Sequence, residues 1–289
     1  MRLLVAVAHY YKAGDGRHGS LGRDPAPRVQ ALRQLILQLH RLFGAPAATL
    51  NHLQRRVEAV ADGGGTLDIR VCVEEPHHLL AELGDLAPGF AAVPCTPEDP
   101  KLLGFCCHQV LAEAWRQACA AGRPYDYVAY LEDDIVITDA EFFLKLRQFN
   151  RAFGDGYLLM PNRIETAEHL GQLRRFYIDG DYNPAASAAW RQAGDQQLAL
   201  QHLGELVRFV QPPNLHAGCF FLNAAQAETY FSSEHSRSID TSFHGPLESA
   251  ATLGMLKTFQ LMKPAPGNGR FLTVEHAGRN FMGLVPALS

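Results

Sequence analysis

The chain has 289 residues, with 47% hydrophobic and 19% charged residues and a formal net charge of -4. This composition is typical of a globular protein with enough length for a sizeable core. The small net charge gives no electrostatic reason to expect nucleic acid or an anionic membrane as a partner. No apolar run approaches the length of a membrane span, and the apolar start at Met1–Ala8 is too short for a signal peptide. We therefore expect a cytoplasmic protein.

The six cysteines show no C-x-x-C pair and no regular spacing. Cys106, Cys107 and His108 are adjacent, but neighbours on a helix point about 100° apart and do not converge on one ion. We expect reduced thiols in the core, which suits a reducing compartment, and no zinc site.

The first half of the chain alternates predicted strands and helices. Continuous apolar runs predict buried strands at 3–8, 67–73, 90–93, 127–131 and 157–160. Apolar residues at helical spacing predict helices at 28–43, 77–83, 100–120 and 140–149. This βαβαβ succession predicts an α/β fold with a mostly parallel central sheet flanked by helices.

The second half is less regular. We expect an irregular segment from Gln172 to Trp190, a helix over Gln196–Val210, and a strand over His216–Leu222 that Gly218 interrupts. Helices at 224–231 and 246–255 and a strand at 271–275 complete the pattern. We see no internal repeat and no linker, so the expectation is one domain, 1–289, with a first half at 1–137 and a more irregular second half at 138–289.

Three consecutive carboxylates, Glu132-Asp133-Asp134, follow the predicted strand Tyr127–Leu131, and a second apolar run follows at once. Adjacent acids at the end of a buried strand are costly unless a cation or hydrogen-bond donors receive the charge. Helix capping is the alternative, but Thr138 and Asp139 already stand at that cap. Ligands bind beyond the carboxyl ends of parallel strands, which is where the acids lie. The pattern therefore favours a divalent-metal site.

The run Gly14–Gly19 matches G-x-G-x-x-G, but its context differs from a dinucleotide-binding turn. Such a turn needs the glycines directly between strand and helix, whereas here the strand ends near Ala8 and the helix begins near Arg28. We interpret this run as a flexible loop that closes over phosphates with Arg17, Arg23 or Arg28.

Two further groups have both a structural and a functional interpretation. Glu248 follows Pro246 at a predicted helix start, where an acid is favourable, and it is also a candidate general base with Asp240 as its rival. His276 follows a predicted strand and is a candidate imidazole ligand for the carboxylate site, with His216 as a weaker candidate.

The combination resembles a GT-A fold glycosyltransferase. The segment Tyr130–Ile137, continued by Glu141-Phe142-Phe143, is similar to the Glu-Asp-Asp version of the DxD motif in inverting N-acetylglucosaminyltransferases. Leu215–Leu222 is similar to the glycine-containing strand that borders donor sugar and acceptor. Two departures are a first acid that is Glu rather than Asp, and Ser249 after Glu248 in place of a second acid.

The resemblance implies a nucleotide-sugar-binding first half and an acceptor-binding second half. It implies a metal-dependent enzyme that uses Mn²⁺ or Mg²⁺ and a nucleotide-sugar donor, with a UDP-sugar favoured. The sugar would pass to a hydroxyl of a glycan or small acceptor, in polysaccharide biosynthesis. By this resemblance the residues divide into three groups: metal ligands Asp134 and His276; donor-site residues His9, Tyr10, Arg28, Glu132 and Asp133; and base candidates Glu248 and Asp240.

Lids over the site are expected at Lys12–Pro27 and Gln172–Trp190, because a glycosyl donor must be kept from water. Tyr177, Tyr182 and Trp190 would stack on acceptor sugars or anchor the second lid to the core.

Two other functional classes stay open. The first is a metal-dependent nucleotidyltransferase, although Ala8-His9-Tyr10-Tyr11 stands where that class would carry a Gly- and Arg-rich signature. The second is a module that binds nucleotide sugar or Ca²⁺ without turnover.

Overall fold

A five-stranded sheet forms the centre of the computed structural model, which describes residues 1–14, 16, 19–44, 48–59, 65–180, 188–189, 197–278 and 281–282. Its strand order is β13-β6-β1-β4-β5. The four strands from the first half of the chain run parallel, and β13 pairs with β6 in the antiparallel sense. Their bounds are β1 (Arg2–His9), β4 (Thr66–Glu74), β5 (Ala91–Cys95), β6 (Tyr127–Glu132) and β13 (Cys219–Asn223).

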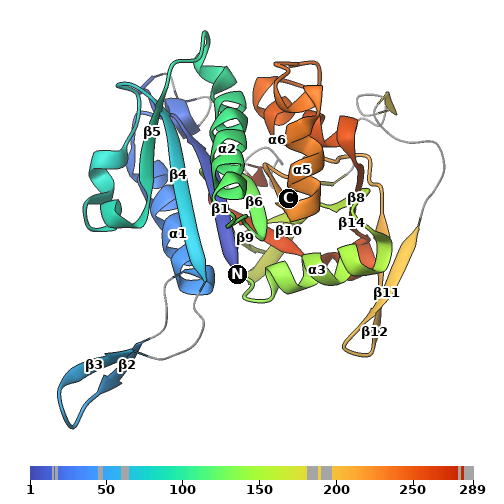
Figure 1. The fold of residues 1–289 in the computed structure, drawn as a ribbon, viewed down its shortest axis with the longest axis horizontal. Helices are drawn as coiled ribbons and strands as arrows, with labels where there is room; N and C mark the ends of the chain where they lie inside the picture. The colour runs from blue at the N-terminus through green and yellow to red at the C-terminus, as the bar shows by residue number, and fades with distance from the viewer. Residues whose placement is uncertain are drawn as a thin grey trace.

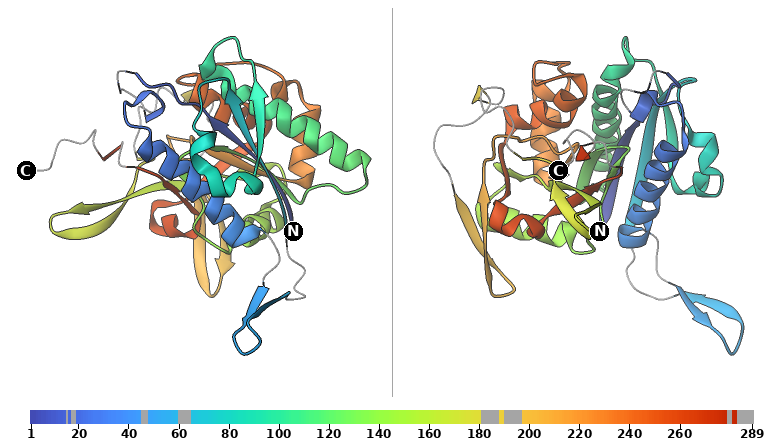
Figure 2. Two further views of the ribbon diagram at one scale, coloured as in Figure 1. Left: turned by 90° about the vertical axis from the view of Figure 1, so that its left-hand side faces the viewer. Right: turned by 180° about the vertical axis from the view of Figure 1, so that it is seen from behind.

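Helices cover both faces of this sheet, as the sequence predicts for an α/β fold. Figure 2 shows the sheet between α1 on one side and α2 on the other. The apolar positions of α1 that recur at helical spacing, from Leu32 to Phe43, are buried. The bounds are α1 (Ala26–Phe43), α2 (Leu103–Ala120), α3 (Phe142–Phe153), α5 (Ala224–Ser232) and α6 (Pro246–Thr258), with 3-10 turns η1 (Gly19–Leu21), η2 (Leu80–Gly89), η3 (Pro100–Leu102), η4 (Glu234–Ser236) and η5 (Pro266–Phe271).

Two smaller sheets from the second half pack beside the central one (Figure 1). The first has the order β10-β9-β15-β7 and the second the order β11-β12-β14-β8. Their bounds are β7 (Ile135–Val136), β8 (Tyr157–Leu159), β9 (Asn162–His169), β10 (Gln172–Tyr177), β11 (Leu198–His202), β12 (Glu205–Val210), β14 (Gln260–Pro264) and β15 (Thr273–His276). Strand β7 directly follows the acidic run and pairs with β15, so it brings the end of β15 to the acids.

The helix expected over Gln196–Val210 is wrong: the described part of this segment is the antiparallel hairpin β11–β12. The physical signal is a period of two on β12, where Val207 and Phe209 are buried while Leu206 and Arg208 are exposed. Gly204, with φ of 85°, lies in the turn between the two strands. Alternation of this kind places one face of a strand on the core.

The irregular segment expected from Gln172 to Trp190 is wrong in its first part, because Gln172–Tyr177 is strand β10. Tyr177 lies against Gly269, where an added Cβ would meet its ring at 2.9 Å. Tyr182 and Trp190, the other expected acceptor-stacking residues, lie outside the described residues, as does Arg17 of the expected phosphate loop. A further hairpin, β2 (Ala48–Asn51) with β3 (Arg56–Ala59), was not predicted.

No described helix is both long enough and apolar enough to cross a bilayer. All six cysteines are free thiols.

Replacing Phe209 with Ala should lower the free energy of unfolding by about 3–5 kcal/mol, the usual cost of emptying a buried aromatic site. Phe209 is fully buried and its ring lies 4.9 Å from Phe149 and 5.4 Å from Phe271, between centroids. Urea unfolding measures the change. Arg208→Ala, at the exposed neighbouring position, is the control and should change stability little. Equal effects of the two substitutions would contradict the hairpin.

Candidate functional site

The end of β1 holds the middle carboxylate of the acidic run. Ala8 pairs with Glu132 in the sheet, so His9 and Asp133 leave neighbouring strands side by side. His9 Nδ1 lies 2.5 Å from Asp133 Oδ2, and His9 Nε2 accepts the backbone N–H of Leu79 at 3.0 Å. Because Nε2 is an acceptor, Nδ1 carries the hydrogen that His9 donates to Asp133. Both side chains are almost fully buried.

Arg28, in the first turn of α1, joins Asp133 to Asp134. Its Nη2 pairs with Asp133 Oδ1, and its Nη1 donates to Asp134 Oδ2 at 2.9 Å. One guanidinium therefore bridges two adjacent carboxylates, which is the use to which the planar fork of arginine is suited. The expected donor-site residues His9, Arg28 and Asp133 thus lie together. Tyr10, the next residue along, is directed to His77, with ring centroids 5.7 Å apart.

His276 lies on the other side of Asp134. Its Nε2 is 3.5 Å from Asp134 Oδ2, and its Nδ1 is 2.9 Å from Oε1 of the buried Glu165 on β9. Burial lowers the pKa of His276, but hydrogen bonds to Asp134 and Glu165 outweigh it and raise the pKa to about 9. The imidazole is therefore a cation between two carboxylates at neutral pH. Burial raises the pKa of Asp134, yet Arg28 and His276 hold it well below its usual range.

Glu132 differs from Asp134 in its protonation. Burial, followed by the charge of Asp134, raises the pKa of Glu132 to about 8, so this group is a protonated acid at neutral pH. Its Oε1 lies 3.9 Å from Nε2 of His216. Burial, then the charge of Arg163, holds the pKa of His216 well below its usual value, so this imidazole is neutral. The site thus holds a neutral acid and a neutral base beside the charged groups.

Gly218 makes room for Glu132. Its φ is 64°, and a Cβ at this position would lie 2.9 Å from Glu132 Oε2 and 3.1 Å from the side chain of Ile135. The backbone oxygen of Gly218 also accepts the N–H of Glu132 at 2.9 Å. The glycine that interrupts the predicted strand is therefore in contact with the acidic run.

A buried ionic network that was not predicted lies next to the site. Asp179 accepts Arg163 Nε at 2.8 Å and Lys263 Nζ at 2.8 Å, and Lys263 Nζ also donates to the backbone oxygen of His216 at 2.6 Å. Burial raises the pKa of Asp179, and the charges of Lys263 and Arg163 outweigh it and lower it to about 2. These residues lie on separate segments, Arg163 on β9 and Lys263 on β14, which belong to different small sheets that the fold brings together. The sequence signal for buried charges here was that two charged residues, Arg163 and Glu165, stand two apart on strand β9 and so share one face.

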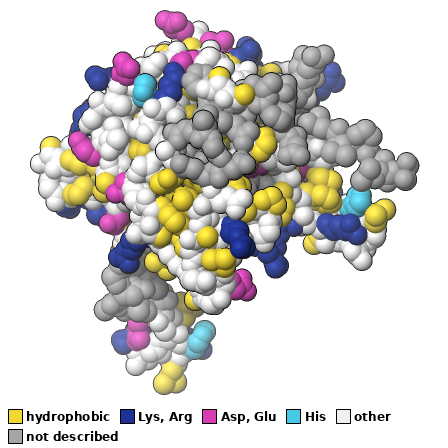
Figure 3. All heavy atoms as spheres, turned by 90° about the vertical axis from the view of Figure 1, so that its right-hand side faces the viewer, with side chains coloured by type: hydrophobic (Ala, Val, Ile, Leu, Met, Phe, Trp, Pro, Cys, Tyr) yellow, Lys and Arg dark blue, Asp and Glu magenta, His cyan; other side chains and the backbone are white. Residues whose placement is uncertain are grey.

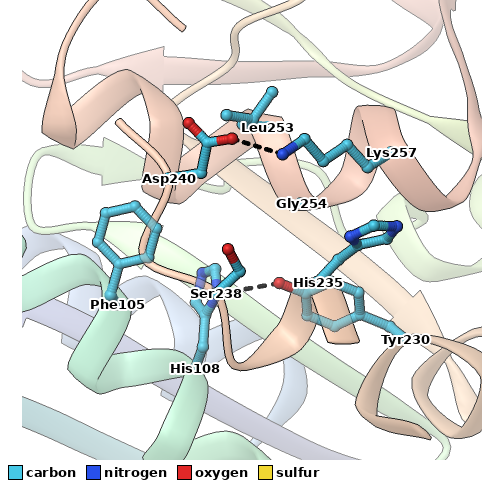
Figure 4. Close-up of a pocket in the computed structure, with 9 residues that line it drawn as sticks. All are labelled: Phe105, His108, Tyr230, His235, Ser238, Asp240, Leu253, Gly254 and Lys257. Carbon is cyan, nitrogen blue, oxygen red and sulfur yellow. Dashed lines mark hydrogen bonds and ion pairs between the residues drawn. The ribbon is translucent and has the colours of Figure 1, made fainter. Parts of the chain in front are cut away.

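The two base candidates have different surroundings. Glu248 stands in the first turn of α6, and its charge helps to raise the pKa of Glu132. Asp240 instead pairs with Lys257 at 2.5 Å and lines a separate pocket with His108 and Tyr230 (Figure 4). Hydrogen bonds from Lys257 and Ser242 lower the pKa of Asp240 to about 2. A carboxylate of such low pKa is a poor proton acceptor.

The acidic run fits a divalent ion that arrives with a phosphate-bearing substrate. Among the described residues no group of three or more His, Cys, Asp or Glu side chains is arranged to hold a metal alone. Asp134 Oδ1, however, is buried without a hydrogen-bond partner, and His276 lies beside the other oxygen of the same carboxylate. Mg²⁺ commonly takes one or two protein ligands and completes its shell with water and substrate phosphates. Asp134 meets that smaller requirement, and His276 would join it as a ligand only by releasing its Nε2 proton.

No protein-family model and no curated protein matches this chain. Similar solved structures include CMP:2-keto-3-deoxy-manno-octonic acid synthetase complexed with CTP (13% identity, 92% of each chain covered, TM-score 0.36). They also include a mannose-1-phosphate geranyltransferase from Thermus thermophilus (14% identity, 91% of this chain and 74% of that chain, TM-score 0.40). A third is a putative glucose-1-phosphate thymidylyltransferase from Bacillus anthracis (9% identity, 90% and 86%, TM-score 0.37). Similarity at this level assigns no function.

Gly218→Ala should destabilise the protein by about 1–3 kcal/mol, because a side chain at positive φ is strained and its Cβ would press on Glu132. Denaturant unfolding measures this loss. Gly156→Ala is the matched control, since a Cβ at Gly156 meets nothing within 4 Å. A Gly218 variant as stable as the Gly156 variant would refute the close contact.

The raised pKa of His276 makes stability depend on pH. Because the folded pKa of about 9 lies above the ordinary value of 6.5, the stabilisation is complete below pH 6.5 and is lost as the pH rises through 9. His276→Gln should therefore lower the free energy of unfolding by about 3 kcal/mol at pH 6, and the difference should shrink by pH 10.

Urea unfolding of both proteins at several pH values checks this expectation. Glu132 contributes a loss of the same sign as the pH rises toward 8, so the difference between wild type and variant isolates His276. His52→Gln, at an exposed position in the β2–β3 hairpin, is the control. A difference that stays constant from pH 6 to 10 would show that His276 is not the titrating group.

Proposed function

We propose that this protein is a metal-dependent transferase that binds the phosphates of a nucleotide-activated substrate at the carboxyl end of β6. One observation carries the proposal: Asp133 and Asp134 are buried there between Arg28, His9 and His276, where parallel strands end. These partners offset much of the cost of burying two adjacent carboxylates, but Asp134 Oδ1 stays buried without a hydrogen-bond partner. A divalent ion with its phosphate ligands accounts for the arrangement.

The reaction we favour is glycosyl transfer from a nucleotide sugar, with a UDP-sugar as the first donor to test. Asp134, with His276 once its Nε2 proton has left, would hold Mn²⁺ or Mg²⁺, which when bound neutralises the charge that develops on the leaving phosphates. Arg28 would supply further positive charge at the same place. Glu132, protonated at neutral pH, can donate a hydrogen bond to the substrate.

Glu248 is the proposed general base for the acceptor hydroxyl. A hydroxyl is a poor nucleophile, and a carboxylate within reach lowers the cost of its attack. The charge of Glu248 acts on Glu132 of the acidic run, whereas Asp240 is engaged by Lys257 in a different pocket. We therefore assign the role to Glu248 and not to Asp240. If the base stands opposite the leaving phosphates, the configuration of the sugar inverts.

Nucleotidyl transfer is the second candidate. In that reaction a sugar phosphate attacks a nucleoside triphosphate and pyrophosphate leaves, and an ionised phosphate needs no general base. The observation in its favour is Arg28, a cation that the first turn of α1 brings to the acids. The same metal site would serve both reactions. They differ in the products released, which makes a direct assay decisive.

Thermal stabilisation by UDP, GDP and CMP, each with and without Mn²⁺, tests the metal and nucleotide site. We expect a rise in Tm with one nucleotide that requires Mn²⁺ and that Asp134→Asn abolishes. Glu141→Gln, which removes an exposed acid nearby in the chain, should leave the shift intact. A shift that is indifferent to Mn²⁺ and to Asp134 would refute the metal site.

Product analysis tests the reaction itself. With nucleotide sugars and a glycan acceptor, glycosyl transfer releases a nucleoside diphosphate, and Glu248→Gln should lower kcat by about 10²–10⁴-fold. Asp240→Asn should retain activity within a few-fold. Pyrophosphate release from a nucleoside triphosphate and a sugar phosphate, indifferent to Glu248, would instead establish nucleotidyl transfer.

A further inference from the structure

Two hairpins of the second half share one sequence pattern. His169–Phe176 reads His-Leu-Gly-Gln-Leu-Arg-Arg-Phe, and His202–Phe209 reads His-Leu-Gly-Glu-Leu-Val-Arg-Phe. The pattern occupies the same structural positions in β9–β10 and β11–β12, because His169 pairs with Gln172 and His202 with Glu205. No internal repeat was predicted from the sequence, and this short one becomes visible once both segments are known to be hairpins.

Both turns break the same two local preferences. A two-residue turn with positive φ at both positions favours Asn, Asp or Gly at the first of them. Here that residue is leucine, Leu170 with φ of 52° and Leu203 with φ of 49°. The two side chains are also among the most exposed apolar groups of the described chain, at 71% and 88%. In both turns a leucine adopts positive φ and is exposed to solvent, against its preferences for backbone conformation and for burial. The same exception at two equivalent positions points to a function for these leucines.

Each tip leucine is followed along the strand by a second leucine and an arginine. Leu173 and Leu206 are exposed, and Arg175 and Arg208 stand two residues further on. Residues two apart in a strand lie on one face, so each hairpin presents Leu and then Arg with increasing distance from its tip. In each hairpin the arginine therefore lies about 7 Å further from the tip than the leucine two residues before it.

The hairpin β2–β3 also has an exposed leucine at its tip followed by arginines, although its turn lacks the Leu-Gly pair. Its tip residue Leu53 is 93% exposed, and Arg55 and Arg56 follow it. Leu50 pairs with Val57 across the hairpin, and both are exposed.

All three hairpins extend away from the body of the molecule, β2–β3 and β11–β12 toward the lower edge of Figure 1 and β9–β10 to the side in the left view of Figure 2. Figure 3 shows hydrophobic side chains beside Lys or Arg and His on the protruding parts of one face.

We propose that these hairpin tips dock the protein on an anionic lipid surface, with the tip leucines among the acyl chains and the arginines at the phosphates. A stable protein interface needs a continuous patch of about 800 Å² on each partner, which two or three apolar side chains on each of separate hairpins do not form. A lipid surface accepts separate apolar points at its boundary and holds cations at the headgroups. The net charge of -4 concerns the whole chain, whereas at the hairpins Arg55, Arg56, Arg174, Arg175 and Arg208 outnumber Glu58, Glu168 and Glu205. The proposal is independent of the reaction catalysed.

Vesicle co-sedimentation of the full chain tests it. The vesicles are phosphatidylcholine alone or phosphatidylcholine with about 30% phosphatidylglycerol, an anionic fraction that attracts basic segments. The test variant is Leu53→Ser with Leu170→Ser and Leu203→Ser, all at exposed positions whose change should leave the fold intact, as circular dichroism would verify. Leu144→Ser, on α3 and 59% exposed, is the matched control.

We expect binding to the anionic vesicles, roughly ten-fold weaker or more for the triple variant, unchanged for the control, and reduced for Arg175→Gln with Arg208→Gln. No binding of the wild type to anionic vesicles would overturn the proposal, as would equal binding of the triple variant. Sedimentation velocity without lipid tests the alternative that a second copy of the chain covers the tips. A dimer that the triple variant abolishes would assign the tips to a second copy of the chain and overturn docking on lipid.

Discussion

The site depends on how two adjacent carboxylates find charged and hydrogen-bonding partners inside a folded protein. Asp133 and Asp134 leave the end of β6, and three cations or donors from distant parts of the chain meet them: Arg28 from α1, His9 from β1 and His276 from β15. Each partner is placed by a different piece of regular structure. The register of β1 on β6 sets His9, and the pairing of β15 with β7 sets His276. The acids therefore tie the central sheet to the smaller sheet of the second half.

The side chains around the acidic run fall into a charged pair and a neutral pair. Asp134 stays charged beside a cationic His276, whereas Glu132, two residues earlier, stays neutral beside a neutral His216. Neighbouring groups whose environments push their pKa values apart are the usual basis of acid and base roles. The charged pair is suited to an ion and phosphates, and the neutral pair to uncharged polar groups such as sugar hydroxyls.

Sequence patterns were sufficient for the parallel strands of the central sheet and for locating the acidic run, because buried parallel strands appear as continuous apolar runs and Glu132-Asp133-Asp134 is local. They did not reveal the hairpin β2–β3. They failed for the segment Gln196–Val210, where we expected a helix. The described part is a hairpin, which the period-two alternation on β12 and the turn glycine Gly204 indicate. The roles of Glu165 and Lys263 could not be found from the sequence, because they depend on contacts between distant segments that only sheet pairing creates. Gly218 was identified as an interruption of a strand, but the reason for it, room for the Glu132 carboxylate, required the structure.

Strand β9 serves two regions of the molecule at once. Near its start Glu165 holds His276, and just past its end Leu170 forms the exposed tip. A strand cannot shorten without breaking its backbone hydrogen bonds. The stretch from Glu165 to Leu170 therefore fixes a distance of about 16 Å between these two residues. If the tip rests on a bilayer, the same strand acts as a spacer that sets how high the phosphate site stands above the headgroups. A substrate whose reactive end projects that far from the surface would then reach the site while its anchor stays in the lipid.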